Sequence, residues 1–162
     1  MTAGGRRRQV LGGTEPQITA QLGGQGEVLR DPAVDLPGAP PGYAPDLAVT
    51  APGAAPGGDG RWAATDLEAV LDVLPRPAPG PDLARLLRLY AASGVPVYVA
   101  VDPAGAVCTV HTDPQRPGAY HLAEKVPFGE DLHLQLAGRT LVIDTAGLPA
   151  DPARPTRARR RG

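Results

Sequence analysis

The residues of this sequence that are best placed to do chemistry are two aspartates at the ends of two apolar segments. Asp46 follows Pro45 and opens a short apolar run, and Asp72 lies near the end of the run Leu67–Leu74. If both runs are neighbouring strands, the two carboxylates can meet at one edge of a sheet and hold a hard divalent cation such as Mg²⁺. Such an ion activates water and neutralises charge on a phosphodiester. Spacing alone also leaves open the ordinary roles of an aspartate in a turn or on an edge strand.

A helix over residues 82–93 is the clearest of the elements that would position this pair. Its apolar residues recur at helical spacing and share one face: Leu83, Leu86, Leu87 and Tyr90. Pro81 suits the first helical position, and Gly94 stands where a left-handed residue commonly ends a helix. The spacing therefore predicts one amphipathic helix that packs on a sheet.

Apolar runs predict the strands of that sheet. Val97–Val101 is a continuous apolar run rich in valine, which is typical of a central strand covered on both faces. The run Leu67–Leu74 fits a buried strand, although its length also permits a helix. Further strands are predicted at Asp46–Thr50, Val107–His111, Tyr120–Leu122, Leu132–Leu136 and Thr140–Ile143. The fold class expected is α/β of the mixed α+β kind, with a mixed central sheet, one dominant helix and a C-terminal β hairpin or meander.

The remaining segments give weaker signals. Glycines interrupt every candidate helix before residue 30, so we expect residues 1–30 to be a flexible N-terminal lead-in. Residues 31–60 hold seven prolines and six glycines and read as loops around a short strand. The predicted domain covers residues 31–149, and residues 150–162 are expected to form a basic, disordered tail.

Charge is distributed unevenly along the chain. Residues 9–153 contain eight basic and seventeen acidic residues, a net charge of −9, so the predicted domain should repel a phosphate backbone. The basic tail includes Arg157, Arg159, Arg160 and Arg161, which could bind nucleic acid by releasing counterions. A charge run of this kind more commonly stays in water, so both interpretations remain open.

The cellular setting is also expected from composition. Cys108 is the single cysteine, which fits a reducing compartment. No apolar run approaches 18 residues, and the arginines at positions 6–8 are not followed by the apolar stretch of a secretory signal. We therefore expect a cytoplasmic protein that has no contact with a membrane.

The motifs around these elements resemble those of the Uma2 family, a group of restriction-endonuclease-like proteins in the PD-(D/E)xK nuclease superfamily. The resemblance rests on Pro45-Asp46 before a strand, on the segment VLDVL at residues 70–74, and on the segment YAASGVPVY at residues 90–98 followed by Val101-Asp102. It implies a restriction-endonuclease-like core and Mg²⁺- or Mn²⁺-dependent hydrolysis of phosphodiester bonds in DNA. By resemblance, Asp46 and Asp72 are the catalytic and metal-binding acids, and a homodimer is a further expectation.

One position departs from the family pattern in substance. The family's catalytic lysine corresponds to Leu86, and the sole lysine of the chain, Lys125, lies outside the motif. Arg85 and Arg88 flank Leu86 and could stabilise negative charge, but an arginine cannot act as a base. The sequence therefore predicts an endonuclease-like protein that is catalytically impaired. The alternatives are a non-catalytic relative that acts as a nucleic-acid-binding or assembly module, and a decayed gene product.

Overall fold

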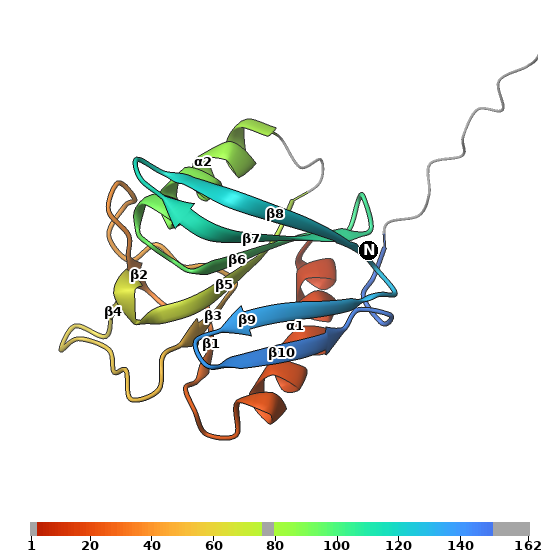
Figure 1. Cartoon of the computed structure of the whole chain (residues 1–162), viewed down its shortest axis with the longest axis horizontal. Helices are drawn as coiled ribbons and strands as arrows, with labels where there is room; N and C mark the ends of the chain where they lie inside the picture. The colour runs from red at the N-terminus through yellow and green to blue at the C-terminus, as the bar shows by residue number, and fades with distance from the viewer. Residues whose placement is uncertain (1–2, 76–79, 151–162) are drawn as a thin grey trace, which may run out of the picture.

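The computed structural model describes residues 3–75 and 80–150, and within them six strands form a central mixed sheet (Figure 1). The strands, in spatial order, are β1 (Val28–Arg30), β3 (Leu47–Thr50), β5 (Leu67–Val73), β6 (Val97–Asp102), β7 (Val107–Gln115) and β8 (Ala119–Pro127). Strands β5 and β6 are parallel, and the other neighbours are antiparallel. The fold is mixed α+β, as the sequence predicts.

The two most apolar strands lie inside this sheet. Strand β6 has β5 and β7 as neighbours and is buried from Val97 to Val101, which confirms the central strand. The run from Leu67 is strand β5, which decides between the strand and the helix that its length allowed. Strands β7 and β8 are each nine residues long and extend well beyond the segments predicted from sequence. The polar ends of both strands lack an apolar pattern that would mark them.

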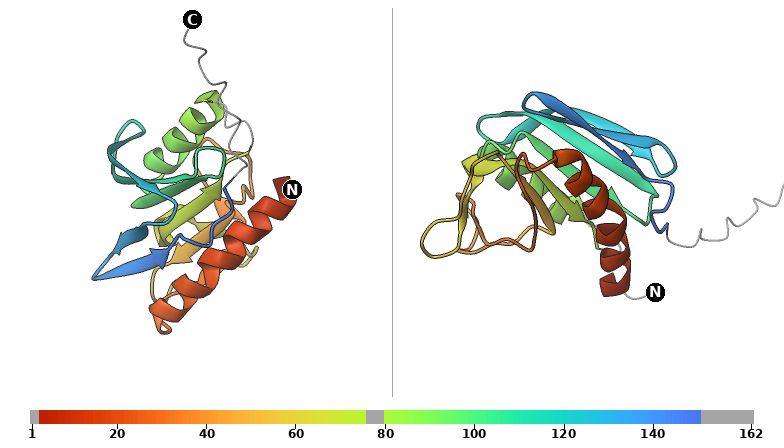
Figure 2. Two further views of the ribbon diagram at one scale, coloured as in Figure 1. Left: turned by 90° about the vertical axis from the view of Figure 1, so that its right-hand side faces the viewer. Right: turned by 90° about the horizontal axis from the view of Figure 1, so that it is seen from below.

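Two layers cover the sheet, one on each face (Figure 2). Helix α2 (Gly80–Ala92) lies on one face, and helix α1 (Ala3–Leu22) lies on the other with the hairpin of β9 (Asp131–Leu136) and β10 (Arg139–Asp144). A short parallel pair, β2 (Val34–Asp35) and β4 (Trp62–Ala63), and a 3-10 helix at Ala64–Asp66 pack on the α2 side. Helix α2 is the amphipathic helix expected from the leucine spacing, and its N-terminal boundary lies two residues earlier.

Helix α1 corrects the expectation for residues 1–30. Glycines do not break this segment: it forms a 20-residue helix that even contains Pro16. Its buried residues form one stripe, Arg6, Val10, Leu11, Thr14, Ile18 and Leu22, and the apolar members of the stripe join the core on their side of the sheet. Intrinsic helix propensity is a weak effect that tertiary packing overrides, which is why the glycine-rich composition gave the wrong answer.

Two glutamines fix α1 against the outer edge of the hairpin. The Gln17 side chain accepts from the Asp144 N–H at 2.8 Å and donates to the Asp144 carbonyl at 2.9 Å. Gln21 makes the same pair of bonds with Val142, at 2.7 and 2.6 Å. These side chains satisfy backbone groups that an edge strand otherwise leaves unpaired. They also set the position of α1 along the sheet, and so the position of the residues in its first turns.

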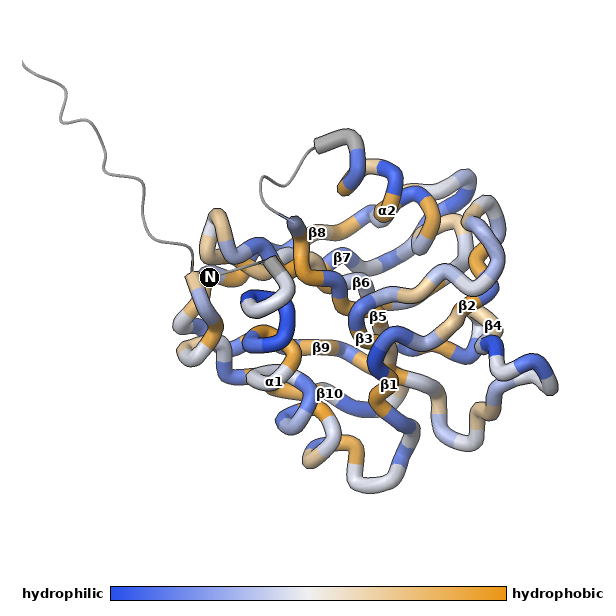
Figure 3. The backbone as a smooth tube through the Cα atoms, turned by 180° about the vertical axis from the view of Figure 1, so that it is seen from behind, coloured by the Kyte–Doolittle hydropathy of each residue, from blue (hydrophilic) through white to orange (hydrophobic). Residues whose placement is uncertain are grey.

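Hydropathy follows this architecture (Figure 3). Apolar segments concentrate in the strands, whereas the tip of the loop just before β4 is hydrophilic. Across residues 3–75 and 80–150, the structure contains no helix with the length and apolar character needed to cross a membrane.

Candidate active site

Asp46 and Asp72 are brought together at one end of the central sheet. Strands β3 and β5 run antiparallel with Leu47 opposite Leu71, so Asp46 and Asp72 face one another one residue further along. The Asp46 N–H donates to Asp72 Oδ1 at 2.9 Å. The meeting point lies at the ends of two inner strands rather than at an outer edge of the sheet. The two acids therefore converge as the sequence predicts, but they meet at the ends of inner strands and not at an outer edge of the sheet.

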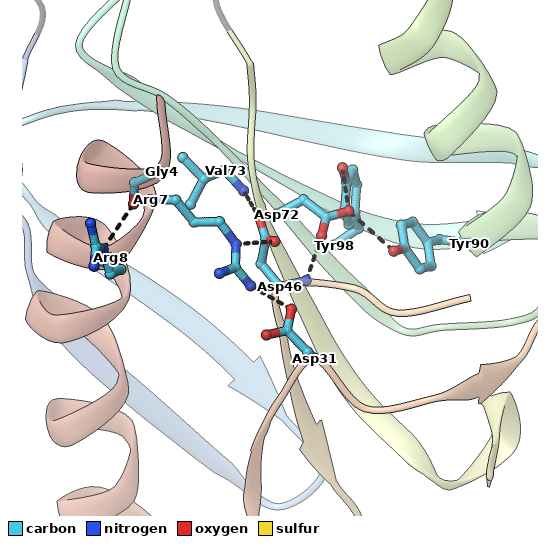
Figure 4. Close-up of polar contacts among 9 residues, drawn as sticks. All are labelled: Gly4, Arg7, Arg8, Asp31, Asp46, Asp72, Val73, Tyr90 and Tyr98. Carbon is cyan, nitrogen blue, oxygen red and sulfur yellow. Dashed lines mark hydrogen bonds and ion pairs between the residues drawn. The ribbon is translucent and has the colours of Figure 1, made fainter. Parts of the chain in front are cut away.

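Both carboxylate oxygens of Asp46 accept bonds from the protein (Figure 4). The Val73 N–H donates to Asp46 Oδ2 at 2.7 Å. Asp46 and β5 are therefore joined by two hydrogen bonds, this one and the bond from the Asp46 N–H to Asp72. The Arg7 side chain donates from Nε to Oδ1 at 2.6 Å. Arg7 also pairs through Nη2 with Asp31, the residue that follows β1. Asp46, which directly precedes β3, thus links this strand to α1 and β5, and Arg7 extends the link to Asp31 after β1.

Asp72 is the more deeply buried acid, with 7% of its surface exposed. Its Oδ2 accepts from the hydroxyls of Tyr90 on α2 and Tyr98 on β6, at 3.1 and 3.3 Å (Figure 4). Burial raises the pKa of Asp72 to about 6, and the nearby Asp46 carboxylate adds to the rise, while the hydrogen bonds from Asp46 N–H and the two tyrosines oppose it. This carboxyl group is therefore far from the open, hydrated oxygen ligand expected from its position in the motif.

The two tyrosines act as fixed donors. Their rings stack with centroids 4.7 Å apart, and Tyr43 meets Tyr90 edge-on at 6.3 Å. Burial, with the negative charge of Asp72, raises the pKa of both Tyr90 and Tyr98 far above its usual range. Both hydroxyls stay protonated near neutral pH, so neither tyrosine can act as a base that takes a proton from water. Their role at this site is to orient Asp72.

The position expected to carry a lysine holds an apolar contact instead. Leu86 is partly buried and packs against the core on the α2 side. Arg85 and Arg88 are exposed, and no hydrogen bond or ion pair joins either of them to Asp46 or Asp72 in the described part of the chain. No contact in the described part of the chain therefore supports the expected role of Arg85 and Arg88 in charge stabilisation. Arg157, Arg159, Arg160 and Arg161 lie outside the described residues.

The donor set does not fit a Mg²⁺ ion as it stands. Mg²⁺ takes near-octahedral oxygen coordination, keeps several waters and is usually held by one or two carboxylates whose oxygens face it. All four carboxylate oxygens of Asp46 and Asp72 already accept hydrogen bonds from protein groups. Within residues 3–75 and 80–150, no group of three or more His, Cys, Asp or Glu side chains is arranged to hold a metal ion.

Sequence reasoning missed Arg7, Asp31, Tyr90 and Tyr98 as members of this site. Arg7 sits in a run of three arginines in a segment that showed no helical pattern, so nothing in the sequence pointed it at Asp46. Tyr98 lies within the apolar run Val97–Val101, for which the sequence predicts only a buried central strand. Its alternation with Val97 and Val99 places it on the face of the sheet that Asp72 shares, and that pattern was a usable signal.

Comparison with a solved structure supports the fold. The protein titled "Crystal structure of a putative nuclease belonging to DUF820 from Anabaena variabilis" matches with a TM-score of 0.61 over 90% of this chain and 79% of its own. The two sequences are 10% identical, so the likeness concerns the fold alone. No curated protein matches the chain.

Comparison with protein families shows to which family the sequence belongs. The family described as "Uma2: Putative restriction endonuclease" matches residues 15–146, which is most of the chain and includes both aspartates and all of α2. The chain therefore belongs to the Uma2 family.

Proposed function

We propose that this chain is an endonuclease-fold protein whose Mg²⁺- or Mn²⁺-dependent hydrolysis of DNA is strongly impaired. One observation carries the proposal: the family's lysine position is Leu86, and that partly buried side chain packs against the core on the α2 side. A positive group at this point orients the attacking water and stabilises the developing charge, and one such electrostatic contact is worth about 10²–10³ in rate. Leucine supplies neither effect.

The acid pair supports the same proposal. A carboxylate assists hydrolysis only through an oxygen that water or a cation can reach. Asp46 bonds Arg7 and Val73, and Asp72 bonds Tyr90 and Tyr98 and is almost fully buried. Both acids therefore hold strands and helices together in this chain, and each of their four oxygens already accepts a hydrogen bond from the protein.

Plasmid cleavage with Mg²⁺ or Mn²⁺ tests the proposal. We expect the wild type to cleave no faster than Asp46→Ala. We also expect Leu86→Lys, made together with Arg7→Met to free Asp46, to cleave at least about a hundredfold faster than Arg7→Met alone, because the lysine restores the missing charge. Leu83→Lys in the same background is the matched control, since Leu83 is a partly buried leucine of the same helix. Cleavage by the wild type that Asp46→Ala removes would contradict the proposal.

Binding of nucleic acid through the basic tail is a second candidate function, favoured by the charge distribution. The body of the chain is acidic, and five arginines gather after residue 153. We expect DNA binding, where measured by fluorescence anisotropy, to weaken steeply with salt and to be lost when residues 152–162 are deleted, because counterion release depends on these charges. Binding that survives the deletion unchanged would rule this function out.

A further inference from the structure

Arg7 occupies the acid site in a manner that the family resemblance does not account for. Helix α1 carries it to the end of the sheet, where Nε meets Asp46 Oδ1 at 2.6 Å and Nη2 meets Asp31 (Figure 4). The nearness of Asp46 raises the pKa of the arginine further above its already high value. One cationic group thus bridges two carboxylates, one just after β1 and the other just before β3.

A bridging cation between two carboxylates is also what a divalent metal ion provides. Mg²⁺ sites in proteins commonly use one or two carboxylates and complete their coordination with water. The guanidinium edge presents two N–H groups in fixed geometry, so it matches a pair of carboxylate oxygens and remains charged at every accessible pH. We propose that Arg7 is the resident cation of this site and takes the place of the metal ion, so that Asp31 and Asp46 bind metal only when Arg7 is absent.

The architecture keeps Arg7 in place. Leu11, one helical turn further on, is fully buried, and Gln17 and Gln21 bind the backbone of β10. The guanidinium is therefore an intramolecular ligand with a high effective concentration at Asp46, against which a free ion must compete. The next residue, Arg8, differs: it points away from the aspartates and donates to the Gly4 carbonyl at 3.4 Å, and within residues 3–75 and 80–150 no hydrogen bond or ion pair joins it to Asp46 or Asp31 (Figure 4).

The experiment measures binding of Mn²⁺ alone by its free-ion EPR signal, without DNA. We expect Arg7→Met to bind one Mn²⁺ and the wild type to bind it at least about tenfold more weakly, because in the wild type the ion competes with a tethered guanidinium. Melting should show the same order: Arg7→Met melts lower than the wild type in EDTA, and added Mn²⁺ raises its Tm, because binding to the folded state stabilises it. Arg8→Met is the matched control and should behave as the wild type.

Further variants locate the ion. Adding Asp46→Asn to Arg7→Met should abolish the Mn²⁺ binding, and adding Asp31→Asn should weaken it. If Arg7→Met does not fold, Arg7→Gln replaces it, since glutamine keeps a hydrogen-bond donor for Asp46 without the charge. The proposal is overturned if the wild type binds Mn²⁺ at Asp46 as tightly as the variant, or if neither Arg7 variant gains binding.

Arg7 can take the place of a metal ion whether or not the site hydrolyses DNA, so Mn²⁺ binding and plasmid cleavage test the two proposals independently. A wild type that binds Mn²⁺ at Asp46 without cleaving DNA contradicts the resident-cation proposal and leaves the proposed function intact. A wild type that cleaves DNA in a manner that depends on Asp46 contradicts the proposed function. Metal binding by Arg7→Met without any cleavage supports the resident cation alone.

Discussion

The Asp72→Asn variant is expected to be more stable than the wild type at pH 7, by about 3 kcal/mol. Burial raises the pKa of Asp72 to about 6 in the folded protein, whereas an unfolded aspartate ionises near its ordinary value of 3.8. A difference of about two pKa units corresponds to roughly 3 kcal/mol of unfavourable free energy for the buried charge. Asparagine removes the charge and keeps an acceptor for the Asp46 N–H, while its amide can donate to the two tyrosine hydroxyls.

The pH dependence of this effect has a definite sign. The folded state holds the Asp72 proton more tightly than the unfolded state, so protonation of Asp72 stabilises the fold. That contribution is fully present below about pH 3.8 and is lost as the pH rises through about 6. The free energy of unfolding of Asp72→Asn should therefore exceed that of the wild type at pH 7, and the two should approach each other towards pH 4.

Urea unfolding of both proteins between pH 4 and 8 measures this difference. Asp131→Asn is the matched control, because Asp131 is exposed at the start of β9 and its replacement should leave the profile unchanged. If Asp72→Asn is less stable than the wild type at pH 7, the ionised carboxylate is favourable where it lies, and the account of its pKa is wrong.

The parts of the fold that the sequence predicts are those in which local pattern and packing agree. Strand β6 is a continuous apolar run, and its neighbours bury both of its faces. Helix α2 has a leucine face, a proline at its start and a glycine after its end, so each local signal favours the same element. These two elements were placed within two residues of their observed boundaries.

Helix α1 could not be predicted in the same way, because its local signals oppose the structure. Glycine and proline cost helix stability, and the contacts that outweigh this cost come from distant residues of the hairpin and the sheet. The bonds of Gln17 and Gln21 reach residues more than 120 positions away in the chain. Such contacts leave no periodic trace in the segment that makes them.

The candidate site also has a part that the sequence predicts and a part that it does not. The meeting of Asp46 and Asp72 follows from two adjacent strands, and strand patterns were visible in the sequence. The partners of these acids were not visible, because Arg7 depends on α1 and because the burial of Asp72 depends on the packing of α2 over the sheet. The residue types suggested a metal site, whereas the contacts around them describe a closed network.

The Leu11→Ala variant is expected to lose about 2–5 kcal/mol of unfolding free energy, the range observed when a fully buried leucine is truncated and leaves a cavity. Leu11 has no exposed surface and joins the core between α1, the hairpin and the central sheet. A flexible lead-in would show no such loss, so the measurement decides whether residues 3–22 are an integral part of the fold.

Leu122→Ala is the matched control for this measurement. Leu122 lies on edge strand β8 with 56% of its surface exposed, so the same truncation there should change the free energy of unfolding by no more than about 0.5 kcal/mol. Equal effects at the two positions would show that α1 contributes nothing specific to stability. A large loss at Leu11 alone would also bear on the acid site, because Leu11 lies one turn from Arg7 and holds the stretch of helix that carries it to Asp46.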